Sequence, residues 1–309
     1  MLNNVRKIKT SRLTWIDFTE FKSEEAEYLR ENYSFHPLDI EDCISPSQRP
    51  KLDEYKNYIF MILTFPIYVP EDKEIVSAEI NFFIGPEFLI TVNKNKLSPL
   101  NKFFEQCQLN DIMREKFMSG NPTKLLYEIL NRLQEYCFPM LDHTSEDIDF
   151  LEKGIFTGFE RTMVEKILII KRNIVNFRKI MQAHKNVLKK LISKNTKYFI
   201  PTSIESYYIN ILEQTKDIWD ILNNQKETID ALHSTNESLI SFRLNSIMKT
   251  LTIFSVIVFP LTLLAAIFGM NTLGSMPFIN NPNGFWFIVG VMLIGCLLML
   301  FIFKKKKWL

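Results

Sequence analysis

Charged residues are missing from one long stretch near the C-terminus, because residues 250–303 contain no Asp, Glu, Lys, Arg or His. The stretch holds two apolar runs, residues 250–270 and 285–303, separated by an uncharged connection. Each run has about the 20 residues that a helix needs to cross a bilayer. The sequence therefore predicts a membrane hairpin of two helices at the C-terminal end.

Cysteine is scarce, with four residues that form no Cys-x-x-Cys pair. This spacing argues against a zinc knuckle or a disulfide framework and favours reduced, buried thiols. The four histidines are isolated, and we find no nucleophile–base pair, so we expect no enzyme. No Gly-x-x-x-x-Gly-Lys-Ser/Thr loop is present either, which argues against ATP as the energy source. A net charge of +2 argues against a nucleic-acid partner.

No apolar segment of the signal-peptide type follows the mixed residues at the start of the chain, so the N-terminus is expected to stay in the cytosol. Two spans would return the C-terminus to the same side. Lys304, Lys305, Lys306 and Lys307 come directly after the second run, where the positive-inside rule places basic residues. The sequence thus predicts a multi-pass protein of the cell (inner or plasma) membrane with both termini in the cytoplasm.

Residues 1–120 are predicted to form a cytosolic α/β domain. The apolar, β-rich segments 57–65 and 78–86 favour strands, and 87–92 favours the second arm of a hairpin. We expect short helices from Ser23, as N-cap, and over 99–116.

Residues 121–200 are predicted to form paired long helices of the same domain. Asn121-Pro122 is typical of a helix start, and Pro139 predicts a kink. An acidic stretch over 142–152 precedes a basic amphipathic helix over 162–192. The opposite charges predict that these two helices pack against each other as a pair.

Glycine and proline are both absent from residues 202–259, which predicts one long helix. Ile211, Ile218, Leu232 and Leu239 follow seven-residue steps that Gln225 interrupts, a pattern more typical of a coiled coil than of a globular helix. We therefore predict a stalk helix over 201–249 that continues directly into the first membrane helix over 250–271.

Small or polar side chains follow one face of the first span at steps of three and four residues, together with two bulkier ones: Asn245, Met248, Thr252, Ser255, Phe259, Thr262 and Ala266. The alternative is that the hydroxyls only bond to their own helix backbone. The second span, 285–303, is bulky and aliphatic, which suits lipid. Because two spans cannot enclose water, a pore would need several copies, with the first span inside.

Three segments carry a family resemblance. They are Phe35-His36-Pro37-Leu38-Asp39-Ile40-Glu41-Asp42-Cys43 with Gln48-Arg49-Pro50-Lys51; Met248 to Thr252 with Pro260-Leu261-Thr262 and Gly269-Met270-Asn271; and the Lys-Lys-Lys-Lys-Trp-Leu end. Together they make the chain resemble the CorA family of magnesium transporters, within the two-span metal-ion channels. The resemblance implies a funnel-shaped homopentamer with an α/β cytosolic domain, long stalk helices and a C-terminal transmembrane hairpin.

The resemblance also implies functional residues. Gly269, Met270 and Asn271 would form the selectivity filter, with Asn271 meeting the hydrated ion. The pore-lining or gating residues would be Asn245, Met248, Leu251, Phe259, Thr262 and Ala266. Phe259 stands where the family often has Met, and Ala266 where it often has Gly. The loop 272–284 lacks the acidic residues that the family often carries there.

Regulation by cytosolic Mg²⁺ is a further implication, through carboxylates between subunits. An Asp is expected where Asn210 stands, so Glu213 and the N-terminal Glu71, Asp72 or Glu74 are possible substitutes. The expected function is potential-driven entry of Mg²⁺, with Co²⁺ and Ni²⁺ also carried. The alternatives are zinc transport within the same superfamily and a membrane-anchored sensor or scaffold without a pore. The last predicted segment, 304–309, is a basic cytosolic tail.

Overall fold

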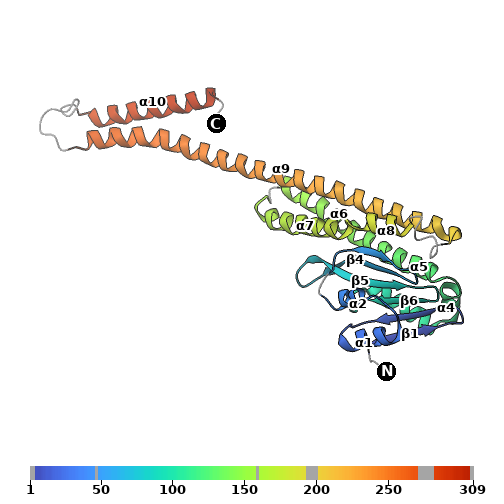
Figure 1. Cartoon of the computed structure of the whole chain (residues 1–309). Coiled ribbons are helices and arrows are strands. Elements are labelled where there is room, and N and C mark those ends of the chain that lie inside the picture. The colour runs from blue at the N-terminus through green and yellow to red at the C-terminus, as the bar shows by residue number, and fades with distance from the viewer. Residues whose placement is uncertain (1–3, 46–47, 158–159, 193–200, 271–281, 307–309) are drawn as a thin grey trace. The chain divides into compact units, whose positions relative to one another are not determined.

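The computed structural model describes residues 4–45, 48–157, 160–192, 201–270 and 282–306. The chain divides into two compact units, Met1–His233 and Ser234–Leu309 (Figure 1). The first unit contains a six-stranded sheet covered by helices. The second contains the end of one helix and a further helix. Asn271 and Lys307 lie outside the described residues.

The sheet of the first unit has the strand order β1-β2-β6-β5-β4-β3. The strands are β1 Val5–Lys9, β2 Thr14–Phe18, β3 Lys51–Glu54, β4 Ile59–Val69, β5 Glu74–Ile84 and β6 Phe88–Val92. Neighbours pair antiparallel except β2 and β6, which are parallel. The predicted hairpin over 78–92 is confirmed as β5 and β6, with Ile84 opposite Leu89. Strand β2 pairs with β6 of this hairpin, and β1, β2 and β3 are strands that the sequence did not predict.

Side chains along β4 alternate between two buried clusters, because successive residues of a strand point to opposite faces. Met61, Leu63 and Phe65 belong to the larger cluster. Phe60 and Ile62 belong to the smaller one. Both faces of the sheet are therefore covered, and the predicted α/β class is confirmed as a three-layer arrangement.

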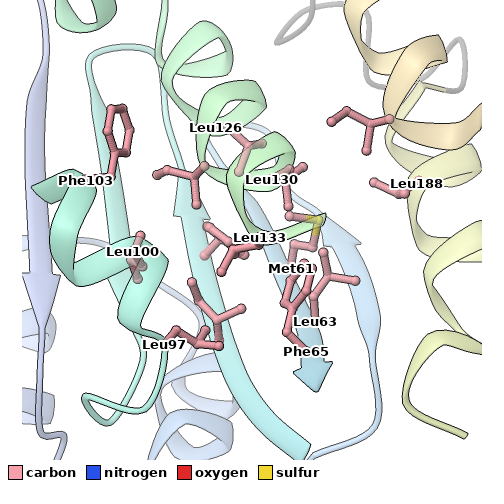
Figure 2. Close-up of a cluster of buried hydrophobic side chains, with 14 of the residues drawn as sticks. Met61, Leu63, Phe65, Leu97, Leu100, Phe103, Leu126, Leu130, Leu133 and Leu188 are labelled. Carbon is pink, nitrogen blue, oxygen red and sulfur yellow. The ribbon is translucent and has the colours of Figure 1, made fainter. Parts of the chain in front are cut away.

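Helices α1, Ser23–Asn32, and α2, Pro37–Ile44, cover the smaller cluster. The larger cluster packs against α3, Ser98–Leu109, α5, Pro122–Glu135, and α8, His184–Ile192. Figure 2 shows Leu100, Leu130 and Leu188 of these helices around Met61 and Leu63.

Two predicted helix details in the first domain are wrong. The helix expected over 99–116 is broken at Asn110 into α3 and α4, Asp111–Met118. Asn110 Oδ1 accepts hydrogen bonds from the backbone N–H groups of Ile112 (2.9 Å) and Met113 (3.2 Å), so this side chain starts a new helix. Ser23 is the first helical residue of α1 and not its N-cap, which is Lys22.

The predicted helix start at Asn121-Pro122 is confirmed, since Asn121 Oδ1 accepts from the N–H of Thr123 at 3.0 Å. The helix that begins there ends at Glu135, before Pro139 is reached. Pro139 lies in the first turn of the next helix, α6, Cys137–Phe156, where its missing N–H costs little. The helix predicted over 162–192 is two helices, α7, Glu160–Met181, and α8. At the start of α8 the buried His184 bonds through Nε2 to the Thr64 carbonyl oxygen of β4 at 2.6 Å.

A single helix, α9, covers Thr202–Phe268, so the predicted continuity between the stalk and the first span is confirmed. In the first unit its buried residues follow alternating steps of three and four: Tyr208, Ile211, Thr215, Ile218, Leu222, Gln225, Ile229 and Leu232. The Oγ1 of Thr215 accepts from Gln134 Nε2 of α5 at 2.6 Å. Gln225 Nε2 donates to the Leu141 carbonyl of α6 at 2.7 Å. This repeat therefore packs within the domain of its own chain, and the expected coiled-coil character is wrong here.

Candidate ion pathway

The predicted pore face lies on the C-terminal part of α9, in the second unit. The pore-lining or gating residues that the family resemblance implies are all exposed: Asn245, Met248, Leu251, Phe259, Thr262 and Ala266. Met248 keeps 60% of its surface and Phe259 keeps 70%. Burying apolar surface stabilises by roughly 25 cal/mol per Å², so side chains of this kind need a lipid or protein partner that a single chain does not provide.

The hydroxyl groups of this face are bonded to their own helix. Thr252 Oγ1 donates to the Met248 carbonyl at 2.8 Å, Ser255 Oγ to the Leu251 carbonyl at 2.9 Å, and Thr262 Oγ1 to the Val258 carbonyl at 2.9 Å. The backbone bonding that the sequence left as an alternative is thus present. It does not remove the hydroxyls as ligands for water, because each oxygen keeps its acceptor lone pairs after its proton is used.

Pro260 lies in the middle of the apolar segment without ending α9. It has no N–H to donate to the Val256 carbonyl one turn earlier, and such a loss is tolerated in a membrane helix where water or a neighbouring helix supplies the missing donor. Together with the hydroxyls, this feature places hydrogen-bond acceptors along a segment that has no charge.

The segment predicted as the filter begins where α9 ends. The Gly269 N–H still bonds to the Ala265 carbonyl at 2.9 Å, and that of Met270 to the Ile267 carbonyl at 3.3 Å. A Cβ on Gly269 would lie 3.1 Å from the Ala265 carbonyl oxygen, so glycine allows this tight end of the helix. Gly269 and Met270 are exposed. Asn271 is outside the described residues, and its role as the ion-facing group stays a prediction.

The second apolar run forms α10, Gly284–Lys305. By length and composition α9 and α10 are each able to cross a membrane, with mean hydropathies of 2.5 and 2.8 in their most apolar windows. Phe285, Trp286 and Phe287 open α10, and Lys304 and Lys305 lie in its last turn. Aromatic and basic residues at opposite ends of a span are typical of the two membrane interfaces.

The candidate regulatory carboxylates of the first domain surround the turn between β4 and β5. Glu71 and Asp72 are exposed in this turn. Glu74 Oε1 accepts from Asn176 Nδ2 of α7 at 3.0 Å and lies 3.7 Å from Arg172 Nε. The Glu74 carboxylate is therefore already held by α7, whereas the other two are open to solvent.

Asn210 and Glu213 are exposed on α9, in the first unit. Within the described ranges, no recorded contact joins either residue to the β4–β5 turn, and no group of three or more His, Cys, Asp and Glu side chains has the arrangement of a metal site. A regulatory site built from these residues stays a prediction.

The contacts of α7 with the β4–β5 turn and with α9 were not predicted from the sequence. Asn173 donates through Nδ2 to the Lys73 carbonyl at 3.0 Å and accepts through Oδ1 from the Ile75 N–H at 3.2 Å. Two residues earlier, Lys171 pairs with Asp230 of α9 at 2.7 Å. Hydrogen bonds from Lys171 and Lys226 lower the pKa of Asp230. Helix α7 thus connects the β4–β5 turn to α9, through pairs too far apart in the sequence for any local pattern to indicate.

Comparison with known proteins gives a family match over nearly the whole chain. The model of the CorA-like Mg²⁺ transporter protein family matches residues 10–305. The cobalt/magnesium transport protein CorA of Thermotoga maritima is 28% identical over 302 residues, which cover 97% of this chain and 84% of that protein.

Solved structures agree in fold. The complete structure of the CorA magnesium transporter from Methanocaldococcus jannaschii superposes with a TM-score of 0.84 at 23% identity and covers 98% of this chain and 93% of that one. The ZntB cytoplasmic domain from Vibrio parahaemolyticus gives a TM-score of 0.61 at 12% identity, covering 75% and 89%.

Proposed function

Because the chain belongs to the family of CorA-like Mg²⁺ transporter proteins, a family of divalent metal transporters and not of enzymes, we propose that it carries Mg²⁺ into the cell. The observation that carries this proposal is the pore face of α9, where the uncharged part of the helix after Lys249 presents hydroxyl oxygens whose protons are already bonded to the backbone. Water molecules around a cation donate hydrogen bonds outward, so a wall of acceptors suits a hydrated cation.

Several copies of the chain are needed to enclose water. We assign the inner wall to the α9 face and the outer, lipid-facing wall to α10. A homopentamer in the cell membrane, with both termini cytoplasmic, is the assembly that the family resemblance implies. Each exposed apolar side chain of α10 and of the membrane part of α9 would then contact either lipid or a neighbouring copy. This accounts for the lack of burial of these side chains within their own unit.

Asn271 is proposed as the ring that meets the ion, with Gly269 and Met270 completing the filter. Mg²⁺ dehydrates reluctantly and usually keeps several of its waters. Amide oxygens of an asparagine ring can accept hydrogen bonds from those waters without replacing them. A neutral ring also binds weakly enough to let the ion leave.

The membrane potential is proposed as the driving force. One elementary charge gains about 2.3 kcal/mol per 100 mV, so a divalent ion gains roughly 4.6 kcal/mol per 100 mV on entry. Co²⁺ and Ni²⁺ are proposed as further cargo. Intracellular Mg²⁺ is proposed to close the pore through carboxylates near the β4–β5 turn, Glu71 and Asp72 being the two with free oxygens, opposite Asn210 or Glu213 of another copy.

Zinc transport is the second candidate, as the alternative within the same superfamily, and the ZntB cytoplasmic domain shares the fold of the cytosolic domain. Zn²⁺ is bound in proteins mainly by Cys, His and carboxylate side chains, and residues 250–303 contain none of these apart from Cys296. Competition during uptake separates the two: saturation by micromolar zinc with no competition from magnesium would favour zinc.

The test is Mg²⁺ uptake into liposomes that contain the purified protein under an inward-directed potential. We expect uptake by the wild type and a loss of at least tenfold in Asn271→Ala, corresponding to about 1.4 kcal/mol of interaction with the hydrated ion. Asn280→Ala changes the same type of side chain in the predicted loop 272–284 that follows, and is the matched control. A sensor or scaffold without a pore would give no uptake in any of the three proteins.

A further inference from the structure

A groove in the first unit is lined by none of the residues assigned above to ion transport or its regulation. It is bounded by residues 48–50, by β4 and β5, and by the junction between α7 and α8, and its volume is about 880 Å³. The polar residues that line it are Gln48, Arg49, Thr64, Ser77, Asn176, Lys179, Gln182 and Asn186. These residues come from five separate segments, so only the fold brings them together.

The charge of the groove is of one sign. Arg49 and Lys179 are both exposed, and neither has a carboxylate within ion-pair distance among the described residues. No Asp or Glu is among the described residues that line the groove. Other cavities of this unit differ, since each combines lysine with a carboxylate: Glu105, for example, lines the cavity of Lys102, and Asp220 that of Lys216.

The two carboxylates that border the groove are turned toward other donors. Glu79 accepts from the Gln48 N–H through Oε2 and from Asn81 Nδ2 through Oε1. Glu74 Oε1 accepts from Asn176 Nδ2. Both carboxylates therefore already accept hydrogen bonds within the protein, whereas no hydrogen bond or ion pair among the described residues occupies the side chains of Arg49 and Lys179.

Neutral donors complete the lining. Among the described residues no hydrogen bond occupies the side chains of Ser77, Gln182 or Asn186, and all three are exposed. Gln182 precedes α8 and Asn186 lies in its first turn, and the backbone N–H groups at a helix N-terminus carry partial positive charge. Guanidinium, ammonium, amide and hydroxyl donors thus converge without a competing anion.

We propose that this groove binds a small anion that bears phosphate groups, as a site separate from the ion pathway. Phosphate oxygens accept from Arg in two parallel bonds and from Lys as a point charge, so Arg49 and Lys179 would hold the anion from two sides. The side-chain amides and the Ser77 hydroxyl would donate hydrogen bonds to its remaining oxygens. The phosphate could come from a soluble metabolite or from a lipid headgroup, which share this chemistry.

The experiment is a binding titration of the full-length protein in detergent, in metal-free buffer, with inorganic pyrophosphate as the probe for a metabolite. We expect saturable binding that weakens roughly tenfold in Arg49→Gln and in Lys179→Gln, the change expected when one charge-assisted hydrogen bond is lost. Glycerol 3-phosphate, titrated in parallel, represents the lipid headgroup; tighter binding of this probe would assign the site to lipid.

Lys189→Gln is the matched control, because Lys189 is exposed on α8 but does not line the groove. Unchanged binding in both groove variants, equal weakening in the control, or no binding of either probe would overturn the proposal. The three replaced residues are exposed, so thermal unfolding is expected to be unchanged and confirms that each variant is folded. The titration contains no transported ion, so its outcome is independent of whether the protein carries Mg²⁺.

Discussion

The two halves of α9 show how one helix meets two different environments. From Tyr208 to Leu232, a buried residue recurs every three or four positions, and the rest of the helix surface is polar or partly exposed. From residue 241 to 252 every position is exposed. Beyond that point Ile253 is buried, whereas Phe254 and Phe259 keep 64% and 70% of their surface. The first half completes a core within its own chain, and the second depends on partners that are not in the chain.

The two halves of α9 differ in their polar contacts and in their charged residues. The first half has ion pairs and amide bonds to α5, α6 and α7 that fix its orientation. The second half has none of the charged residues that could make such contacts after Lys249. A surface without charge and without burial is stable only in a bilayer or against other apolar helices. A polar substitution in the first half should therefore destabilise the first unit, whereas the same substitution in the second half should leave the stability of that unit unchanged.

The largest effect is expected for Ile218→Asn compared with Leu251→Asn. Ile218 is completely buried, so the polar replacement should lower the free energy of unfolding of the first unit by roughly 4 kcal/mol through lost burial and an unpaired amide. Leu251 is 57% exposed, and its replacement should leave that unit unchanged while altering ion flux. Amide hydrogen exchange of β4 measures the first effect. Equal loss of protection in both variants would contradict the comparison.

The second largest expected effect is a pH dependence of about 3 kcal/mol in the free energy of unfolding of the first unit. Burial lowers the pKa of His184 to about 4, against the Thr64 hydrogen bond, which acts in the opposite direction. An unperturbed His titrates near 6.5. Between these values the unfolded chain binds a proton that the folded chain does not, so the free energy of unfolding should fall as the pH drops from about 6.5 to 4.

Urea unfolding at pH 7 and pH 4.5 tests this dependence. His184→Gln keeps a side-chain donor for the Thr64 carbonyl but cannot titrate, so the part of the pH dependence due to this residue should disappear. If the variant retains the full dependence of the wild type, other groups are responsible.

Replacing an exposed leucine by arginine should affect membrane insertion in α10 but not in α3. Leu297 of α10 and Leu109 at the end of α3 are 62% and 85% exposed. An Arg near the centre of a membrane helix costs about 2.5 kcal/mol, whereas an exposed position in water tolerates it within about 0.5 kcal/mol. We expect Leu297→Arg to lower the membrane-inserted fraction and Leu109→Arg to leave it unchanged. Extraction of membranes at alkaline pH measures that fraction.

The sequence predicted the elements whose signals are local. The long helix followed from the absence of Gly and Pro over 202–259, and the β5–β6 hairpin from the Gly85-Pro86 turn between apolar runs. Strands β1, β2 and β3 were missed because charged residues interrupt their apolar pattern: Arg6, Lys7 and Lys9 in β1, and Asp17 in β2. In β3 only Leu52 is apolar. The break at Asn110 was missed because an Asn within a helical pattern becomes a cap only when the chain turns there.

Tertiary contacts could not be predicted from the same patterns. The seven-residue steps of α9 were correct as a periodicity, but the periodicity does not say whether the partner is another copy or the same chain. Gln225, which interrupts the steps, is explained by its bonds to Leu141 and Ser145 of α6. In the pathway, the sequence indicated Thr252, Ser255 and Thr262 by spacing alone. Only the structure shows that their protons are bonded to the backbone.

The smallest effect is expected for Thr262, and it tests whether its oxygen faces the ion. Thr262→Val removes the acceptor at nearly constant volume, so Mg²⁺ flux should fall about tenfold, the equivalent of about 1.4 kcal/mol. Thr262→Ser keeps the acceptor and should stay within about twofold of the wild type on the same scale. Thr250 makes the same backbone bond, to the Ser246 carbonyl at 3.0 Å, but lies outside the three- and four-residue steps of the face. Thr250→Val should therefore leave Mg²⁺ flux in the liposome assay unchanged. An equal loss of flux in both valine variants would mean that the bond to the backbone, and not an ion-facing oxygen, explains the effect.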